Sequence, residues 1–230
     1  INGYEPAQSH YVLYEDRTDD KTFAANSNLN TQITPNISFD GGIAYQNLKS
    51  HNFQYLLDLL GGKYFDDIDP FYKGDQAQSD LQKPNRQVKA GDIYGYNYNF
   101  LSNAINAFTQ FKFSYNKTEF YLAQSYSMSN YQREGLYQNG LYPTSSLGKS
   151  DKVNFENFGF KGGFTYKISG KQLLFFNAAH LTRAPSLRNT FSNSRLNNSI
   201  VNGIESENIS SAEANYVYRS LKFKIRFTAY

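Results

Sequence analysis

The sequence of 230 residues contains no cysteine, no tryptophan and only one methionine. Without cysteine the chain can form neither a disulfide framework nor a thiolate metal site. Charged residues are also scarce, at 19% of the chain against the roughly 25% of a typical soluble domain. The net charge of +3 is too small to indicate a nucleic-acid partner. The missing cysteine excludes the cysteine-rich secreted class and leaves most other compartments open.

Long apolar segments are missing as well. No run approaches the ~20 consecutive apolar residues that a transmembrane helix needs. The N-terminus has no basic stretch followed by an apolar run, so no signal peptide is indicated. A mature or excerpted chain would look the same. The mean hydropathy of −0.63 would by itself suggest a soluble protein.

Aromatic residues, by contrast, are abundant. The chain has 20 tyrosines and 19 phenylalanines, which together make up 17% of it. Low charge, many aromatic residues and many small polar residues suit β-strands that have one face in lipid and the other in a wet lumen. On composition alone, a soluble β-sandwich or solenoid remains an alternative.

The dominant pattern along the chain is an alternation of apolar and polar residues, which is typical of β-strands. In the last segment, Leu221, Phe223 and Ile225 alternate with Lys222 and Lys224. We therefore predict an all-β fold, an antiparallel meander of about nine strands. The predicted strands are 10–15, 22–33, 37–45, 92–115, 118–133, 153–168, 171–183, 209–218 and 221–230.

Connections between these strands fall into two length classes that alternate along the chain. The predicted short turns are 34–36, 116–117, 169–171 and 219–220. The predicted long connections are 46–91, 134–152 and 184–208. Short turns on one rim and long loops on the other are typical of outer-membrane barrels. The pattern therefore predicts part of a transmembrane β-barrel, with the short turns at the periplasmic rim.

The apolar positions predict which residues face outward from the barrel. They share one parity across the tight turns and are Phe111, Phe113, Phe120, Phe164, Tyr166, Tyr216, Phe223, Ile225 and Phe227. Within 92–115 the parity changes between Tyr98 and Phe111, and a β-bulge around 102–106 would produce this change. Because bacterial single-chain barrels have even strand numbers, we expect either an excerpt with open edges or one miscounted strand.

One short helix is predicted, within the long connection 46–91. Ser50 or Asn52 can cap it, and glycines at 61–62 would end it. Its apolar stripe would consist of Phe53, Leu56, Leu57 and Leu60.

Several stretches resemble TonB-dependent outer-membrane receptors. The stretch HLTRAPSLR at 180–188 is similar to the segment that enters a late extracellular loop in that family. The stretch ESENISSAE at 205–213 is similar to the family's descending Pro-Glu motif, with Ser206 in place of the usual proline. Further similarity, to receptors of Bacteroidetes-type bacteria, is carried by LDLLGGKY at 57–64, DID at 67–69, QKPNR at 82–86 and GD at 91–92.

The resemblance implies a fragment of the wall of an outer-membrane transport receptor. Such a receptor takes up a scarce nutrient, for example an iron chelate, a vitamin or an oligosaccharide, with energy coupling. The implied partners are the lipid bilayer, a small nutrient ligand, a TonB-type energy-coupling protein acting through a plug region and, as a further candidate, a surface lipoprotein. Because the plug has no counterpart in the sequence, we expect residues 1–230 to be a partial barrel domain.

Residues suited to catalysis or metal binding are few. His10, His51 and His180 are far apart and lack the spacing of a zinc or catalytic site. The acidic residues Asp66, Asp67, Asp69 and Asp75 could bind calcium, but a solvated acidic turn is the favoured interpretation. We therefore expect no cofactor, no metal and no enzymatic activity.

Residues suited to ligand binding lie in or beside the long connections. Surface loops carry function more often than scaffold does, and Tyr and Arg are enriched at binding hot spots. The candidate ligand-binding residues are Arg133, Tyr137, Tyr142, Arg188 and Arg195. Two other functions remain open, a complete small barrel with a structural or adhesive role and a soluble β-rich carbohydrate-binding module.

Overall fold

The computed structural model describes residues 8–230, which contain almost only β-structure. The long strands are β1 (Leu13–Thr34), β2 (Ile37–Asp58), β5 (Ile93–Ser114), β6 (Thr118–Gly135), β8 (Val153–Ser169), β9 (Gln172–Arg183), β10 (Glu207–Arg219) and β11 (Lys224–Ala229). The short elements are β3 (Phe65–Asp66), β4 (Gln87–Val88), β7 (Gly148–Lys149) and the 3₁₀-helices η1 (Gly74–Ala77) and η2 (Arg188–Thr190). Among the described residues, no helix is long and apolar enough to cross a membrane.

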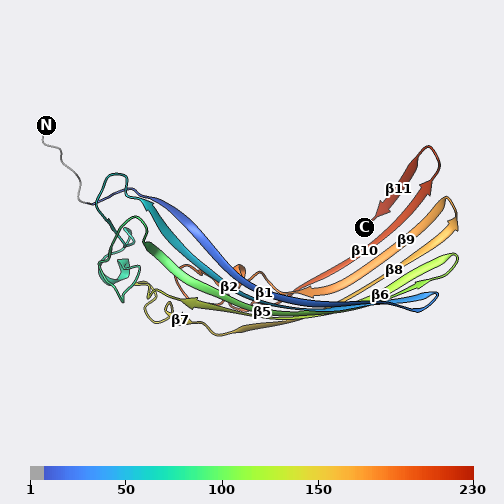
Figure 1. The fold of residues 1–230 in the computed structure, drawn as a ribbon, viewed down its shortest axis with the longest axis horizontal. Coiled ribbons are helices and arrows are strands. Elements are labelled where there is room, and N and C mark those ends of the chain that lie inside the picture. Colours follow the sequence, from blue (N-terminus) through green and yellow to red (C-terminus); the bar gives the residue numbers. More distant parts are fainter. Residues whose placement is uncertain (1–7) are drawn as a thin grey trace.

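The long strands form one curved sheet in which sequential neighbours pair antiparallel (Figure 1). The strand order is β1-β2-β5-β6-β8-β9-β10-β11, and β7 pairs with β6, which gives nine strands. Strands β3 and β4 form a separate two-stranded sheet. The predicted all-β antiparallel meander is therefore confirmed. Within residues 8–230, β1 and β11 are edges that do not pair with each other, so the sheet is open.

The sheet has the predicted number of strands, but two of its members differ from the prediction. Residues 13–15 of the first predicted segment and the whole of 22–33 belong to one strand, β1, which continues through the charged stretch EDRTDD at 15–20. β1 is an exposed edge strand, and charged side chains are common on such edges because they hinder pairing with other chains. The ninth strand is instead β7, which has two residues.

Short turns and long connections alternate as predicted and lie at opposite ends of the sheet. The turns after β1, β5, β8 and β10 are all at the right-hand end of Figure 1. The long connections 59–92, 136–152 and 184–206 leave the other end of the sheet. The last turn is longer than predicted, because Arg219 pairs with Lys224. Ser220 closes this turn, and its Oγ accepts a hydrogen bond from the backbone N–H of Phe223 at 3.1 Å.

One face of the sheet, here called the apolar face, carries the aromatic residues predicted to share a side. Strand pairing places Phe113, Phe120 and Phe164 opposite one another in a transverse row. The rings of Phe113 and Phe120 stack with their centroids 4.5 Å apart. Eight of the nine predicted residues lie in strands on this face. The ninth, Phe223, lies in the last turn, and its ring centroid is 5.7 Å from that of Tyr218.

The predicted helix at 50–60 is wrong, because β2 continues to Asp58. Phe53 pairs with Arg17 of β1 and Leu56 with Tyr14, so the chain is held between two strands. Leu56 and Phe53 are nevertheless buried. Their helix-like spacing gave a local preference that the hydrogen-bonded ladders on both sides of β2 override.

The predicted bulge at 102–106 is also wrong. β5 pairs without interruption from Tyr98 to Ser114 with β6. The irregularity lies nearer the start of β5, opposite Phe53 and Gln54, where Gly95 has a φ of +67°. The tyrosines at 94, 96 and 98 therefore lie on the second face of the sheet, here called the polar face. Near the short turn, the apolar residues of β5 occupy odd positions and lie on the apolar face. Near the long connections they occupy even positions and are buried on the polar face, so the change needs no bulge at 102–106.

Two buried apolar clusters lie on the polar face at the end of the long connections. There β5 contributes three aromatic residues against which the connection 184–206 packs. This cluster contains Tyr96, Tyr98, Phe100 and Phe191, with Leu187 and Ile200 at its margin. A second cluster contains Leu56, Val88 and Tyr94, with Val12, Leu59 and Phe65 at its margin. The long connections are thus folded back onto the sheet.

Two adjacent glycines test the assignment of the faces. A Cβ on Gly163 would overlap the ring of Tyr121 on the polar face, whereas a Cβ on Gly162 would lie 3.4 Å from Leu122 Cδ2 on the apolar face. We predict that Gly163→Ala lowers the free energy of unfolding by about 1–3 kcal/mol through overpacking. Gly162→Ala should change it by no more than about 1 kcal/mol. Denaturant titration in detergent measures both, and equal effects would contradict the assigned faces.

Candidate functional site

The candidate site is the end of the sheet that carries the long connections. The connections 59–92, 136–152 and 184–206 meet there over the polar face of β5 and β6. Backbone hydrogen bonds join them, from Leu81 N–H to the carbonyl of Gln138 at 2.7 Å and from Asn198 N–H to the carbonyl of Ser145 at 2.7 Å. Three segments far apart in the sequence therefore form one continuous loop layer.

Arg133, near the end of β6, lies at the centre of this layer. Its side chain is only 1% exposed. Nε donates to the carbonyl of Ser194 at 2.6 Å, and Nη1 donates to the carbonyl of Ser146 at 3.0 Å and to Asn198 Oδ1 at 2.5 Å. The guanidinium carbon lies 5.0 Å from the centroid of the Tyr98 ring. One side chain thus joins two of the long connections to the sheet.

Arg133 is a buried cation that neutral groups surround. Within the described part of the chain it forms no ion pair with Asp or Glu. Burial lowers its pKa to about 10, and the neighbouring Tyr98 acts in the opposite direction. Arg133 therefore remains charged at neutral pH, and its hydrogen bonds to oxygen atoms offset the cost of removing it from water.

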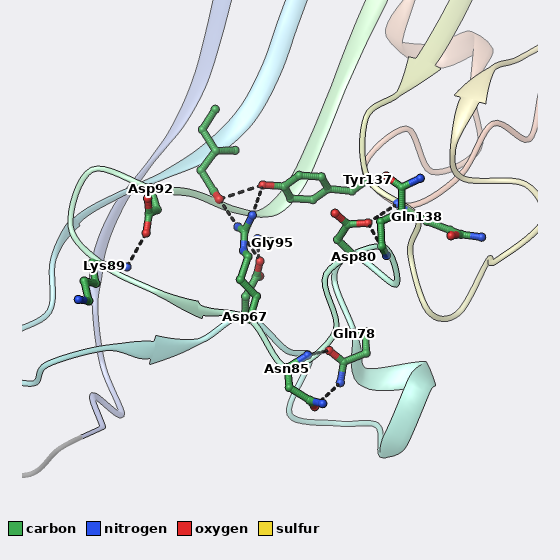
Figure 2. A network of polar contacts seen from close by, with 12 residues as sticks. Asp67, Gln78, Asp80, Asn85, Lys89, Asp92, Gly95, Tyr137 and Gln138 are labelled. Carbon is green, nitrogen blue, oxygen red and sulfur yellow. Dashed lines mark hydrogen bonds and ion pairs between the residues drawn. The ribbon is translucent and has the colours of Figure 1, made fainter.

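A second polar centre joins the connection 59–92 to β5 and to Tyr137 (Figure 2). The carboxylate of Asp67, which is 3% exposed, lies 2.8 Å from Arg86 Nη2 and accepts a hydrogen bond from Gly95 N–H at 2.8 Å. Arg86 Nη1 donates to Tyr137 Oη at 2.9 Å, and Arg86 also donates to the carbonyl of Ile93. Tyr137 Oη donates to that same carbonyl at 2.9 Å.

The ionisation of this centre reflects its burial. Burial raises the pKa of Asp67, although Gly95 N–H and the Arg86 charge act in the opposite direction. Burial acts to lower the pKa of Arg86, but the charge of Asp67, the contacts with Tyr137 and the charge of Asp92 together outweigh burial, so this pKa is raised. Burial also raises the pKa of the Tyr137 hydroxyl. The ion pair is therefore held in a partly dry setting, where loss of one partner is costly.

Two ion pairs join stretches that were singled out in the sequence, one in the connection 59–92 and one between β9 and β10. Asp67 and Arg86, from two separate stretches, form the ion pair described above. Arg183 and Glu207, from two others, face each other across β9 and β10, with Arg183 Nε 2.6 Å from Glu207 Oε1. The similar sequence patterns therefore correspond to structural contacts, and this pairing could not be foreseen from their positions in the chain.

The five candidate ligand-binding residues lie at the same end of the sheet but differ in exposure. Arg133 is buried, and Tyr142 is 36% exposed. Tyr137 accepts a hydrogen bond from Arg86. Arg195 forms an ion pair with Asp16 of β1 at 2.8 Å, and its guanidinium carbon lies 4.7 Å from the centroid of the Tyr96 ring. Arg188 and Arg195 line one surface pocket of about 460 Å³, together with Asn189, Phe191, Ser192, Asn193, Ser194 and Val201.

The acidic stretch 66–75 departs at Asp67 from the solvated turn that was favoured from the sequence, whereas Asp75 is exposed. Asp67 is buried in the ion pair, and Asp66 accepts a hydrogen bond from Gln8 Nε2 at 2.7 Å. Asp69 Oδ1 accepts a hydrogen bond from Phe71 N–H at 3.0 Å. Among residues 8–230, no group of three or more His, Asp or Glu could hold a metal ion.

Sequence reasoning missed Asp67, Arg86 and Tyr98 as organising residues of the loop layer. Arg86 and Asp67 could have been suspected from the stretches QKPNR and DID, because these carried the resemblance. The role of Tyr98 had no sequence signal, since it depends on which face of β5 the connection 184–206 covers.

Comparison with protein-family models, with curated proteins and with solved structures found no match.

Arg133 provides a test of the loop layer. We predict that Arg133→Met lowers the free energy of unfolding by about 2–4 kcal/mol, because it leaves buried oxygen acceptors without donors. Limited proteolysis should then cut 136–152 and 184–206 faster. Arg188→Ala is the matched control, since Arg188 is exposed and its side chain forms no hydrogen bond within residues 8–230. Equal protease resistance of Arg133→Met and the unmodified chain would contradict the role of Arg133 in joining the long connections to the sheet.

The Asp67–Arg86 pair predicts a dependence on pH. Arg86→Met leaves the buried Asp67 carboxylate unpaired and should cost about 3–5 kcal/mol near neutral pH. The pKa of Asp67 in the folded variant should then lie further above its unfolded value, so the folded state binds a proton more tightly. Lowering the pH from about 7 to about 4.5 should therefore reduce the deficit relative to the unmodified chain. Unfolding titrations at both pH values, with Asp67→Asn/Arg86→Met as the control that lacks the carboxylate, measure this. A deficit independent of pH would contradict it.

Proposed function

We propose that this chain is a segment of the wall of an outer-membrane β-barrel, from a TonB-dependent receptor that imports a nutrient. The observation that carries the proposal is the exposed apolar face of the sheet. Six of the aromatic and aliphatic side chains on this face are 39–66% exposed, namely Phe111, Leu122, Phe158, Phe160, Phe176 and Phe227. Monomeric soluble proteins rarely expose contiguous apolar patches beyond a few hundred Å². A lipid environment would accommodate such a face.

The width of the apolar face supports a bilayer as its environment. On β5 the apolar positions extend from Ile105 to Phe113, with Tyr115 directly after the strand, and on β2 from Ile37 to Tyr45. This length fits the ~9–11 residues with which a tilted strand crosses a bilayer. Polar side chains do occur at its centre, and there His180 Nδ1 lies 2.8 Å from its cross-strand neighbour Ser210 Oγ. Such pairing reduces the cost of a polar group in lipid.

A row of asparagines marks one boundary of the apolar band. Asn47, Asn103, Asn130 and Asn154 lie opposite one another on four neighbouring strands of the same face. Asn47 Nδ2 donates to Asn103 Oδ1 at 2.6 Å, and Asn103 Nδ2 donates to Asn130 Oδ1 at 3.2 Å. The other boundary is formed by the short turns. A polar row on one side and polar turns on the other are what a band in contact with lipid requires.

The open edges support a barrel to which further strands belong. β1 and β11 present unpaired backbone groups, which are costly in lipid and prone to aggregation in water. Closure of the sheet with additional strands removes both problems. A soluble carbohydrate-binding module is less well supported, because no second layer covers the apolar face within residues 8–230.

The loop layer is the proposed ligand-binding end. In the receptor it would face the exterior, with Tyr142, Arg188 and Arg195 available to contact a nutrient. Arg133 and Tyr137 would position the loops and would contact ligand only after the layer opens. Aromatic rings stack on flat or sugar-like surfaces, and Arg pairs with carboxylates in a bidentate geometry. Partners of the whole receptor would be the bilayer, an energy-coupling protein acting through a plug and, as a further candidate, a surface lipoprotein. The proposed role is transport, without catalysis.

A charge placed on the apolar face tests its contact with lipid. Phe160 lies in the central row of the band, opposite Gln124 and His180. Phe160→Arg should make folding into lipid vesicles less favourable by about 2–4 kcal/mol, as at a bilayer midplane. Leu221→Arg, in the exposed last turn, should cost no more than about 1 kcal/mol. Equal costs at the two positions would remove the support for a lipid-facing band.

The orientation can be tested because the chain has no cysteine. Single variants Lys73→Cys, in the first long connection, and Lys117→Cys, in the turn between β5 and β6, would each provide one thiol. In intact cells a membrane-impermeant maleimide should label Lys73→Cys, and it should label Lys117→Cys only after the outer membrane is permeabilised. The opposite pattern would show that the short turns face the exterior.

A further inference from the structure

Three of the four short turns carry an exposed lysine. These are Lys117 between β5 and β6, Lys171 between β8 and β9, and Lys222 between β10 and β11. Within residues 8–230, none of the three ammonium groups has an ion-pair or hydrogen-bond partner. Each turn therefore presents a free positive charge at the same end of the sheet.

The surroundings of these turns contain few acids to balance that charge. The four hairpin segments 31–43, 107–125, 161–179 and 211–230 contain three acidic residues, Asp40, Glu119 and Glu213. They contain nine basic residues, Lys112, Lys117, Lys161, Lys167, Lys171, Arg219, Lys222, Lys224 and Arg226. Glu119 is already bound by Lys167, with Nζ 2.6 Å from Oε1. The turn end of the sheet therefore has a strong excess of positive charge.

The turn lysines lie where the apolar band ends. Tyr115 precedes the first turn on the apolar face, and its backbone N–H donates to the carbonyl of Thr118 at 2.8 Å. Phe223, 54% exposed, follows Lys222 directly. An exposed aromatic beside an exposed lysine is the arrangement expected at a membrane–water boundary, where rings sit at headgroup depth and ammonium groups extend to phosphates.

We propose that Lys117, Lys171 and Lys222 bind the phosphates of anionic phospholipid headgroups in the leaflet next to the short turns. The inference rests on the proposed membrane location and adds a lipid preference to it. Each ammonium group can donate hydrogen bonds to phosphate oxygens, and the attraction weakens with salt. An acidic protein segment is the competing occupant, and it would instead use the basic residues on the polar face, Arg219, Lys224 and Arg226, which the strand pairing turns away from the apolar face.

The experiment compares partition of the 230-residue chain into two kinds of vesicle at matched ionic strength. One kind contains phosphatidylcholine only, and in the other a third of the lipid is phosphatidylglycerol. The chain should bind both and should prefer the anionic vesicles. Because a lysine near an anionic surface contributes a factor of about five in affinity, the triple variant Lys117→Gln/Lys171→Gln/Lys222→Gln should lose that preference. Its partition into phosphatidylcholine should not change.

Control variants separate this inference from net charge and from the proposed function. Lys73→Gln/Lys83→Gln/Lys89→Gln removes the same charge from the exposed first long connection and should keep the preference. An equal loss in both triple variants would overturn the inference, as would a loss that appears only in Arg219→Gln/Lys224→Gln/Arg226→Gln. Equal binding of the unmodified chain to both vesicles would overturn the inference and leave the membrane location intact. Binding to neither kind would overturn the membrane location itself.

Discussion

Continuous antiparallel pairing in one register is the constraint on which the rest of this structure depends. From β2 to β11 each strand is locked to its neighbours, so that Ile37, Phe113, Phe120, Phe164 and Phe176 fall in one transverse row. A slip by one residue in any strand would move its aromatic residues to the polar face. The register therefore decides at once which face is apolar, which is polar and where the turns lie.

The same register separates the two ends of the sheet by chemistry. At the turn end, exposed aromatic side chains cover one face, and basic residues are in excess. At the loop end, the long connections pack on the polar face. Contacts of Arg133 and of the Asp67–Arg86 pair join these connections to β5 and β6. A rigid sheet that carries a folded loop layer at one end is a suitable scaffold for ligand binding, since loops positioned by a scaffold commonly carry function.

Much of the fold followed from alternation along the strands, and the errors have identifiable causes. Alternation predicted the meander, the four short turns and the shared face of residues such as Phe113 and Phe227. It failed for Phe53 and Leu56, which have helix-like spacing but lie buried in β2. It also failed for residues 16–21, which were left between two predicted strands although β1 continues through them. In both cases pairing with neighbouring strands, which a local pattern does not contain, decided the outcome.

The candidate site was less accessible to sequence reasoning. The end of the molecule at which it lies could be predicted, because long connections marked it. The internal contacts could not, because they join residues separated by long stretches of chain, such as Arg195 to Asp16 and Arg133 to Asn198. Ligand contact at Tyr142, Arg188 and Arg195 stays a prediction.

Central to this account is the claim that the apolar face of the sheet lies in lipid while the opposite face meets water. Nitroxide labels placed one at a time along β8 from residue 156 to 166 in the cysteine-free chain would test it most directly. In lipid vesicles, labels at even positions such as Phe158, Phe160 and Phe164 should collide mainly with oxygen, which concentrates in lipid. Labels at odd positions such as Lys161 should collide mainly with a water-soluble nickel chelate. Uniform access of the nickel chelate to both sets of positions would contradict the account.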